Sequence, residues 1–207
     1  MFEHFLTLIL SFVFLSDIKV LQAVSCDFDR THLVNNFNET GFLGTWHELE
    51  RTTFQWGDTT WDSQVWTFKR GSDGHLYMAY AGFSPRTQSC TSPNTGLLSG
   101  TGGAYKLTAE GRYEAALRVA YTDYSNIALV YLCYAPEIQG TCDRTSVHVS
   151  LLSRTPALST SQRSVLKAHL DLKCVEDHHL NQASTGLCQV PIPTSKYTFI
   201  TDNLKKN

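Results

Sequence analysis

The sequence predicts an all-β domain, either an up-and-down barrel or a sandwich, with one helix near the C-terminal end. Short runs of β-forming residues recur about every ten residues with turn residues between them, and a single later segment has helical spacing. The chain has 207 residues, of which 42% are hydrophobic and 17% charged, enough apolar material for one packed core. The net charge of −2 and the absence of a long basic run disfavour a nucleic-acid partner.

The N-terminal residues form a separate segment. Residues 5–15 are almost entirely apolar, and small residues follow at Ala23 and Ser25. This pattern is typical of a secretory signal peptide. We therefore expect residues 1–25 to be a signal peptide and residues 26–207 to form a single domain with an extended C-terminal tail. A membrane anchor is the alternative, but charged residues interrupt the stretch, so we expect a secreted, extracellular protein without stable membrane insertion.

The strand-like runs follow one another with short connections. Gly-Ser-Asp-Gly ends the second run and Ser-Pro ends the third. The run over residues 97–104 is rich in glycine, so we expect it to bend, because glycine within a strand often marks a bulge or sharp curvature. The expected strands cover residues 45–53, 62–69, 75–83, 97–104, 105–109, 113–122, 126–134 and 145–153.

One helix is expected after the last of these strands. Ser159 and Thr160 offer oxygen atoms for an N-cap, and apolar residues then recur at helical spacing. The pattern predicts an amphipathic helix over residues 160–174 that packs on the outside of the sheet. A short strand-like run at residues 197–200 is expected to pair with a sheet edge.

Six cysteines follow the leader, and an even number in a secreted chain implies three disulfide bonds. None of them forms a CxxC pair, so no structural zinc or other metal site is expected. Asn38 begins an Asn-Glu-Thr sequon, which predicts glycosylation in a secreted protein.

Three motifs stand in an order and at separations that resemble those of the lipocalin family. They are the Gly-Thr-Trp tripeptide at residues 44–46, the Thr-Asp-Tyr tripeptide at residues 122–124 and Arg154 after the last strand. The chain looks most like the group that contains apolipoprotein D, insect bilin-binding proteins and the crustacyanin-like carotenoid carriers. This resemblance implies an eight-stranded up-and-down antiparallel β-barrel, or calyx, with one C-terminal α-helix packed outside.

The resemblance also implies how the closed end of the barrel is built. Gly44, Trp46 and Arg154 would be structural residues there, with the guanidinium of Arg154 stacked on the indole of Trp46. That pair would seal the floor of the cup and take no part in the ligand site.

Side chains that point into the cup follow from the alternation of strand residues between two faces. If Trp46 points inward, then Glu48 and Glu50 do as well, and a register change of one residue would invert any strand. The ligand-binding residues that the resemblance implies, together with this alternation, are Glu48, Trp56, Trp66, Tyr77, Leu117, Val119, Tyr121, Val130, Leu132, His148 and Ser150.

Three of these residues have two interpretations. Glu48 either accepts hydrogen bonds from a ligand such as a bilin or is satisfied by the backbone or by Arg154, and we favour the second. His148 either contacts a polar group or a haem iron or is a hydrogen-bonded lining residue, and we again favour the second. Trp56 either covers the ligand as part of a lid or packs at the mouth.

The resemblance further implies a bond between the N-terminal arm and the strand after the central hairpin. The expected disulfides are Cys26–Cys133, Cys90–Cys188 and Cys142–Cys174, and the alternative for the last two is Cys90–Cys142 with Cys174–Cys188.

A carrier function follows from the resemblance. We expect a small hydrophobic ligand, namely a bilin, carotenoid, retinoid, sterol or fatty acid, and no obligatory cofactor beyond a bound bilin or carotenoid chromophore. An interaction protein that acts through its surface, as an inhibitor or structural subunit, is the alternative. An enzyme is not expected, since all six cysteines can pair and no Ser/His/Asp arrangement is legible. The oligomeric state is open, with a homo-oligomer among the options.

Overall fold

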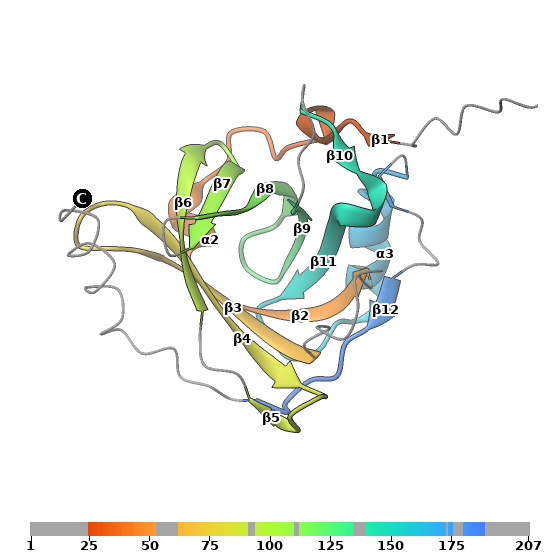
Figure 1. The fold of residues 1–207 in the computed structure, drawn as a ribbon. Helices are drawn as coiled ribbons and strands as arrows, with labels where there is room; N and C mark the ends of the chain where they lie inside the picture. The colour runs from red at the N-terminus through yellow and green to blue at the C-terminus, as the bar shows by residue number, and fades with distance from the viewer. Residues whose placement is uncertain are drawn as a thin grey trace, which may run out of the picture.

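Eight antiparallel strands form a closed barrel in the computed structural model, which describes residues 25–52, 62–90, 94–109, 112–134, 140–172, 174–175 and 180–188 (Figure 1). Each barrel strand pairs with the next one, and the last pairs back with the first to close the ring. This confirms the predicted fold class. The barrel strands are β2 (Gly44–Thr52), β3 (Asp62–Arg70), β4 (Leu76–Ser84), β6 (Asn94–Thr101), β7 (Ala104–Ala109), β8 (Arg112–Thr122), β9 (Ile127–Cys133) and β11 (Val147–Ser153).

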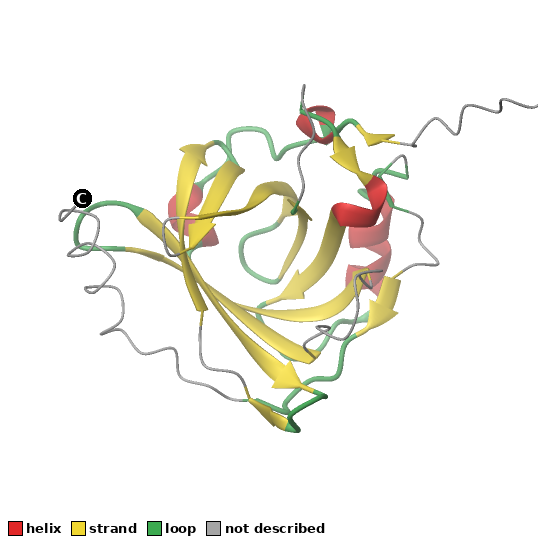
Figure 2. Ribbon diagram, in the orientation of Figure 1, coloured by secondary structure: helices red, strands yellow, loops and turns green. Residues whose placement is uncertain are grey.

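Shorter elements surround the barrel. β1 pairs with β10 in a separate small sheet, β5 pairs with β4, and β12 lies beside β2 (Figure 1). The helix α3 lies outside the ring of strands (Figure 2), where it contacts β9. Their bounds are β1 (Ser25–Cys26), β5 (Ser89–Cys90), β10 (Cys142–Asp143), β12 (Leu180–Gln182), the 3-10 turns η1 (Phe28–Arg30) and η2 (Arg144–Ser146), α2 (Glu39–Phe42) and α3 (Thr160–Ala168).

A capping box begins α3. The Ser159 hydroxyl accepts a hydrogen bond from the backbone of Gln162, whose side chain in turn accepts one from the backbone of Ser159. Leu166 is fully buried in the cluster of residues on the outer face of the barrel wall. The helix ends at Ala168 and not at residue 174 as expected, because the chain turns there so that the N–H of Asp171 reaches the hydroxyl of Tyr131 (2.8 Å).

The wall of the barrel separates two apolar layers. Along β9, Ala128, Val130 and Leu132 belong to the inner core, whereas the residues between them pack on the outside with α3. This alternation is the one predicted from the sequence. It requires all seven residues of β9 to be apolar and buried, which they are.

Four strand pairings contain a register shift, and two of these shifts change the face of expected site residues. The pairing of β8 with β9 shifts between Val119 and Tyr121, and that of β11 with β2 shifts so that Leu49 has no partner across the strands. Each β-bulge turns the residues beyond it toward the opposite face. The expectations for Tyr121 and Glu50 are therefore wrong, since both lie on the outer face.

The glycine-rich segment contains a tight turn. The expected single strand over residues 97–104 is wrong, because Gly102 and Gly103 have positive φ values (65° and 84°) and reverse the chain between β6 and β7. A Cβ atom on Gly100 would come 2.2 Å from the carbonyl oxygen of Ala104, so the two strands can meet only without a side chain at residue 100.

Two of the three expected disulfides are wrong. The structure joins Cys26 to Cys174 and Cys133 to Cys142, in place of Cys26–Cys133 and Cys142–Cys174, and it has Cys90–Cys188. The chain turns after α3 and brings Cys174 to the N-terminal arm, while Cys142 lies only nine residues beyond the end of β9 and closes a local loop. No helix in the described ranges is both long and apolar enough to cross a membrane.

Candidate functional site

Arg154 closes the floor of the barrel. Its guanidinium carbon lies 3.6 Å from the ring centroid of Trp46. Its N–H groups donate to the carbonyl oxygens of Thr45 (3.0 Å), Gly41 (3.0 Å) and Tyr124 (3.2 Å). The side chain therefore braces the strand β2, the segment before it and the β8–β9 hairpin at one point, and its hydrogen bonds go to the main chain.

The other two motifs support this floor. Gly44 has a φ of 101°, and a Cβ atom there would lie 3.1 Å from Nη1 of Arg154. In the hairpin, the carboxylate of Asp123 accepts hydrogen bonds from the N–H groups of Asn126 (2.7 Å) and Ile127 (2.9 Å). Partial burial raises the pKa of Asp123, but these N–H donors outweigh it, so the pKa falls below its ordinary value.

Aromatic residues fill the closed end above this floor. The ring of Phe42 lies 5.1 Å from that of Trp46, 4.8 Å from that of Phe68 and 5.3 Å from that of Phe37, measured between centroids. Contacts of this kind pack densely and leave little room. The closed end of the barrel is therefore filled by packed side chains.

A buried polar cluster lies on the inner wall above the aromatic layer. The side chain of Glu48 is fully buried, and its carboxylate accepts hydrogen bonds from Nε2 of His148 (3.0 Å), from the hydroxyl of Ser150 and from Nη1 of Arg51 (3.1 Å). Glu48 is thus satisfied by these three side chains and not by Arg154. Burial alone would raise the pKa of Glu48, but its bond to His148 and the charge of Arg51 lower it below the ordinary value.

Arg51 is a member of this cluster that sequence reasoning missed. Regular alternation from Trp46 would place residue 51 outside, but the bulge at Leu49 turns Arg51 inward, opposite Ser150. Its side chain is only 9% exposed, and Nη2 lies 3.7 Å from the carboxylate of Asp62. The only signal in the sequence is an arginine in a run that is otherwise typical of a buried strand.

Two tyrosines lie near the polar cluster and the inner core. The ring of Tyr134 meets that of His148 edge-on at 6.5 Å between centroids. Burial and then the charge of Glu114 raise the pKa of Tyr80. The Tyr80 phenol therefore keeps its proton at neutral pH.

The structure brings together most of the expected ligand-binding residues. Their role as ligand contacts stays a prediction, and Trp56 lies outside the described residues. The residues found on the inner face are Glu48, Trp66, Leu117, Val119, Val130, Leu132, His148 and Ser150.

Tyr77 and Tyr121 do not line the interior. Leu76 and Met78 are the inward neighbours on β4, so Tyr77 lies on the opposite face, where its hydroxyl donates to Asp73 (2.6 Å). Tyr121 follows the bulge of β8 and stacks on His169, with 4.2 Å between the ring centroids. No turn residue next to Tyr77 or Tyr121 in the sequence indicates which face of its strand the side chain occupies.

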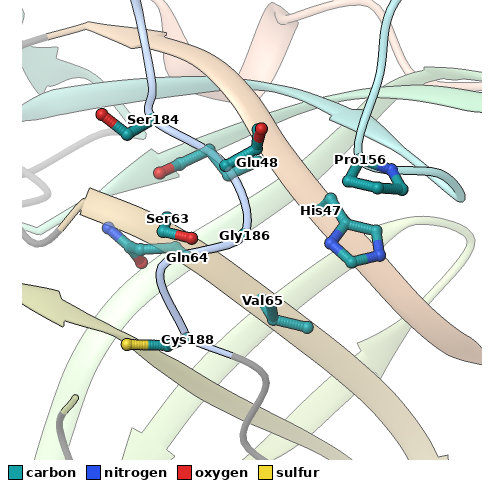
Figure 3. Close-up of a pocket in the computed structure, with 10 residues that line it drawn as sticks. His47, Glu48, Ser63, Gln64, Val65, Pro156, Ser184, Gly186 and Cys188 are labelled. Atoms are coloured by element: carbon teal, nitrogen blue, oxygen red, sulfur yellow. The ribbon is translucent and has the colours of Figure 1, made fainter.

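A small side pocket marks the place where β2 and β3 separate (Figure 3). The two strands pair only as far as His47 and Val65. Residues 184–188 run across the gap beyond this point, and the N–H of Leu187 donates to the hydroxyl of Ser63 (3.1 Å). The volume of about 70 Å³ is well below that of typical ligand pockets. The pocket is lined by His47, Glu48, Ser63, Gln64, Val65, Pro156, Ser184, Thr185, Gly186 and Cys188.

The C-terminal segment therefore seals the barrel wall. β12 pairs with the end of β2, the N–H of Ser184 donates to Asp62 (2.8 Å), and Cys188 is bonded to Cys90 beside β4. Among the described residues, no group of three or more His, Cys, Asp or Glu side chains is placed to hold a metal ion.

Comparison with known proteins gives matches by structure alone. No family model and no curated protein sequence matches this chain. Lobster apocrustacyanin A1 is 18% identical with a TM-score of 0.58, and the match covers 72% of this chain and 80% of that one. The allergen Per a 4 from cockroaches is 14% identical with a TM-score of 0.61, covering 76% and 94%. Insecticyanin from the tobacco hornworm Manduca sexta is 19% identical with a TM-score of 0.56, covering 75% and 85%. These neighbours are lipocalins, and with its closed eight-stranded barrel and outer helix the present chain has the lipocalin fold.

Proposed function

We propose that this protein is a secreted carrier that holds a small hydrophobic molecule in the open half of its barrel. One observation carries the proposal: an apolar inner wall faces a small buried polar cluster within a closed barrel. Leu117, Val130 and Leu132 are at most 1% exposed on that wall, and Glu48 and His148 are the polar groups of the cluster. Sites that combine an apolar lining with a few convergent polar groups suit small organic ligands.

The energetics of such a site are sufficient for specific binding. Burial of roughly 300 Å² of ligand surface at about 25 cal/mol per Å² would contribute up to ~7 kcal/mol before entropy costs. One or two hydrogen bonds to the polar cluster would then fix the orientation of the ligand. We expect a dissociation constant in the micromolar range on this basis.

A pigment is the ligand class that we favour. The resemblance to bilin-binding proteins and carotenoid carriers supports it, as does the lipocalin fold. A retinoid, a sterol or a fatty acid are the colourless options. No enzymatic role is proposed.

Absorbance and tryptophan fluorescence test this proposal. Natively purified protein is expected to show a visible band, in the red for a bilin or in the blue-green for a carotenoid. Stripped protein is expected to take up biliverdin, a carotenoid or retinol at one molecule per chain, with quenching of Trp46 and Trp66 fluorescence. Colourless protein that takes up neither biliverdin nor a carotenoid would rule out the pigment. Failure to bind any of the three would favour the surface-acting alternative.

Secretion is a separate part of the proposal. The apolar leader and the three disulfides support it. Expression in a eukaryotic secretory host should yield protein in the culture medium whose first residue lies near residue 26. This protein should carry a glycan on Asn38, which is exposed at the start of α2. N-terminal sequencing and glycosidase treatment check both points. An uncleaved chain held in the membrane fraction would contradict the secreted form.

A further inference from the structure

The three disulfide bonds differ in how far solvent reaches them. The cysteines of Cys26–Cys174 and Cys133–Cys142 are at most 2% exposed and belong to the apolar cluster on the outer face of the barrel wall. Cys90 lies in the exposed two-residue strand β5, which pairs with the end of β4, whereas Cys188 is 4% exposed. Cys90–Cys188 is therefore the bond that a dissolved thiol can reach from the surface.

This bond fastens residues 184–188, which we call the strap. Before the strap, β12 pairs with β2, and the N–H of Ala183 donates to the carbonyl oxygen of Leu49 (2.8 Å). The strap then leaves β2 and runs across β3 (Figure 3), and its last residue is bonded to Cys90. The pairing of β12 thus anchors one end of the strap, and the disulfide anchors the other.

Between these two anchors the strap is held by hydrogen bonds to side chains. The N–H of Ser184 donates to Asp62 (2.8 Å), and that of Leu187 donates to the hydroxyl of Ser63 (3.1 Å). Residues 184–187 are exposed, Leu187 to 50%, so the burial of apolar surface adds little. Segments with exposed hydrogen bonds and little buried apolar surface open readily. The disulfide is therefore the main restraint on the far end of the strap.

The strap closes a gap that the barrel strands leave open. β2 and β3 pair only as far as His47 and Val65, and the strap forms one side of the small pocket beyond that point. Glu48 lines the same pocket and is buried, with its carboxylate bonded to His148. Displacement of the strap would bring solvent to a part of the wall that is otherwise covered.

We propose that Cys90–Cys188 is a thiol-reducible latch. A small thiol such as glutathione opens this bond while the other two disulfides stay intact, and the strap then leaves the gap between β2 and β3. Exposed disulfides are the labile ones, whereas buried structural disulfides resist reduction. The latch stays closed in an oxidising extracellular medium and opens where thiols are abundant. This inference does not depend on a bound ligand.

Two thiol–disulfide exchanges complete the reaction. A thiolate attacks Sγ of Cys90, the exposed member of the pair, and forms a mixed disulfide with it, while Cys188 leaves as a thiolate that takes up a proton. A second thiolate attacks the sulfur of the first thiol in this mixed disulfide and releases Cys90, which is also protonated. Two thiol molecules are thereby oxidised to one disulfide, and Cys90–Cys188 is reduced to two thiols.

Differential alkylation of the native, full-length mature protein tests the latch. The protein is incubated with increasing concentrations of reduced glutathione, thiols are blocked with iodoacetamide at successive times, and peptide mass spectrometry reads each cysteine. Cys90 and Cys188 are expected to become alkylated at least about tenfold faster than the other four cysteines, at a rate proportional to the glutathione concentration. Glutathione trapped early as a mixed disulfide is expected on Cys90.

Three outcomes of this experiment would overturn the proposal. They are the loss of all three bonds together, the earlier loss of another bond, and a mixed disulfide found mainly on Cys188. The variant Cys133→Ser/Cys142→Ser supplies the control, since it removes a bond in another part of the wall. Its Cys90–Cys188 bond should be reduced at the wild-type rate, and a faster rate would mean that reduction follows general opening of the barrel.

Hydrogen exchange shows whether the strap moves. In protein alkylated at Cys90 and Cys188 alone, the amides of Ser184 and Leu187 should exchange at least about tenfold faster than in the oxidised protein. The amide of Arg154, which donates to the carbonyl oxygen of Asn126 at the closed end (2.8 Å), should exchange at an unchanged rate. Unchanged exchange in the strap would contradict its release, and faster exchange at Arg154 as well would contradict a local latch.

Discussion

Glu48 shows how a buried charge is maintained at the scale of a single residue. A carboxylate with no exposed surface is costly unless it is paired and hydrogen-bonded. His148, Ser150 and Arg51 together meet this requirement from two neighbouring strands. Removal of one partner should therefore cost more than replacement of the whole group.

Arg51→Met should destabilise the protein by about 3 kcal/mol, because it leaves Glu48 buried without its cationic partner. The double variant Arg51→Met/Glu48→Gln should recover most of this loss, since no uncompensated charge is left. Urea denaturation followed by tryptophan fluorescence measures both. Equal free energies of unfolding for the single and double variants would show that the two residues are not coupled.

The pH dependence of stability should carry the signature of Glu48. Burial raises the pKa of Glu48, but the combined effect of His148, Arg51 and Ser150 lowers it by more. The pKa in the folded state therefore lies below the ordinary value of 4.5. The unfolded state then binds more protons than the folded state between these two values. The contribution of Glu48 to the free energy of unfolding is therefore fully present above about pH 4.5 and is lost as the pH falls through the folded pKa.

Acid unfolding of wild type and Glu48→Gln tests that assignment. The free energy of unfolding should fall more steeply with decreasing pH below about 4.5 in the wild type than in the variant. Parallel curves for the two proteins would mean that other carboxylates account for the acid sensitivity.

At the scale of the elements, the sequence predicts the regular alternation of side chains along a strand but does not predict the β-bulges that interrupt it. The inner and outer residues of β9 follow from strict alternation, and so do His148 and Ser150 on β11. The faces of Tyr121 and Arg51 depend on bulges, and one extra residue in a strand has no compositional signature. The disulfide partner of Cys26 depends on where the chain turns after α3, and that of Cys142 depends on the loop after β9, neither of which spacing alone determines.

The C-terminal segment is an element whose position depends on one disulfide. Replacement of Cys90 and Cys188 together by serine should lower the free energy of unfolding by about 2–4 kcal/mol, because the bond closes a long loop. The amides of Ser184 and Leu187, which donate to Asp62 and Ser63, should also exchange faster with solvent. Hydrogen exchange measured by NMR checks this.

The bond between Cys133 and Cys142 supplies the matched control. Its replacement by serines should leave the exchange of Ser184 and Leu187 unchanged, since it closes a separate loop beyond β9. If the amides of Ser184 and Leu187 exchange no faster without the Cys90–Cys188 bond, the pairing of β12 with β2 alone holds residues 184–188 between β2 and β3.

At the scale of the whole molecule, the barrel has two ends with different tasks. The closed end is sealed by Arg154 on Trp46, as the motifs predict. Tilted aromatic rings that no motif predicts pack above this pair. The other half combines apolar walls with a buried polar cluster in which Glu48 is paired with Arg51 and bonded to His148. The three motifs thus predict the fold and its closed end, whereas the residues that would distinguish between ligands are not part of any motif.

Methyl NMR spectra during titration with retinol test most directly whether a ligand occupies the barrel interior. Val130 and Leu132 face inward on β9, while Leu129 on the same strand and Leu151 on the neighbouring one face α3. We predict large shifts for the methyl groups of Val130 and Leu132 and small shifts for those of Leu129 and Leu151. Shifts confined to the outer pair, or no shifts at saturating retinol, would contradict the proposed carrier function.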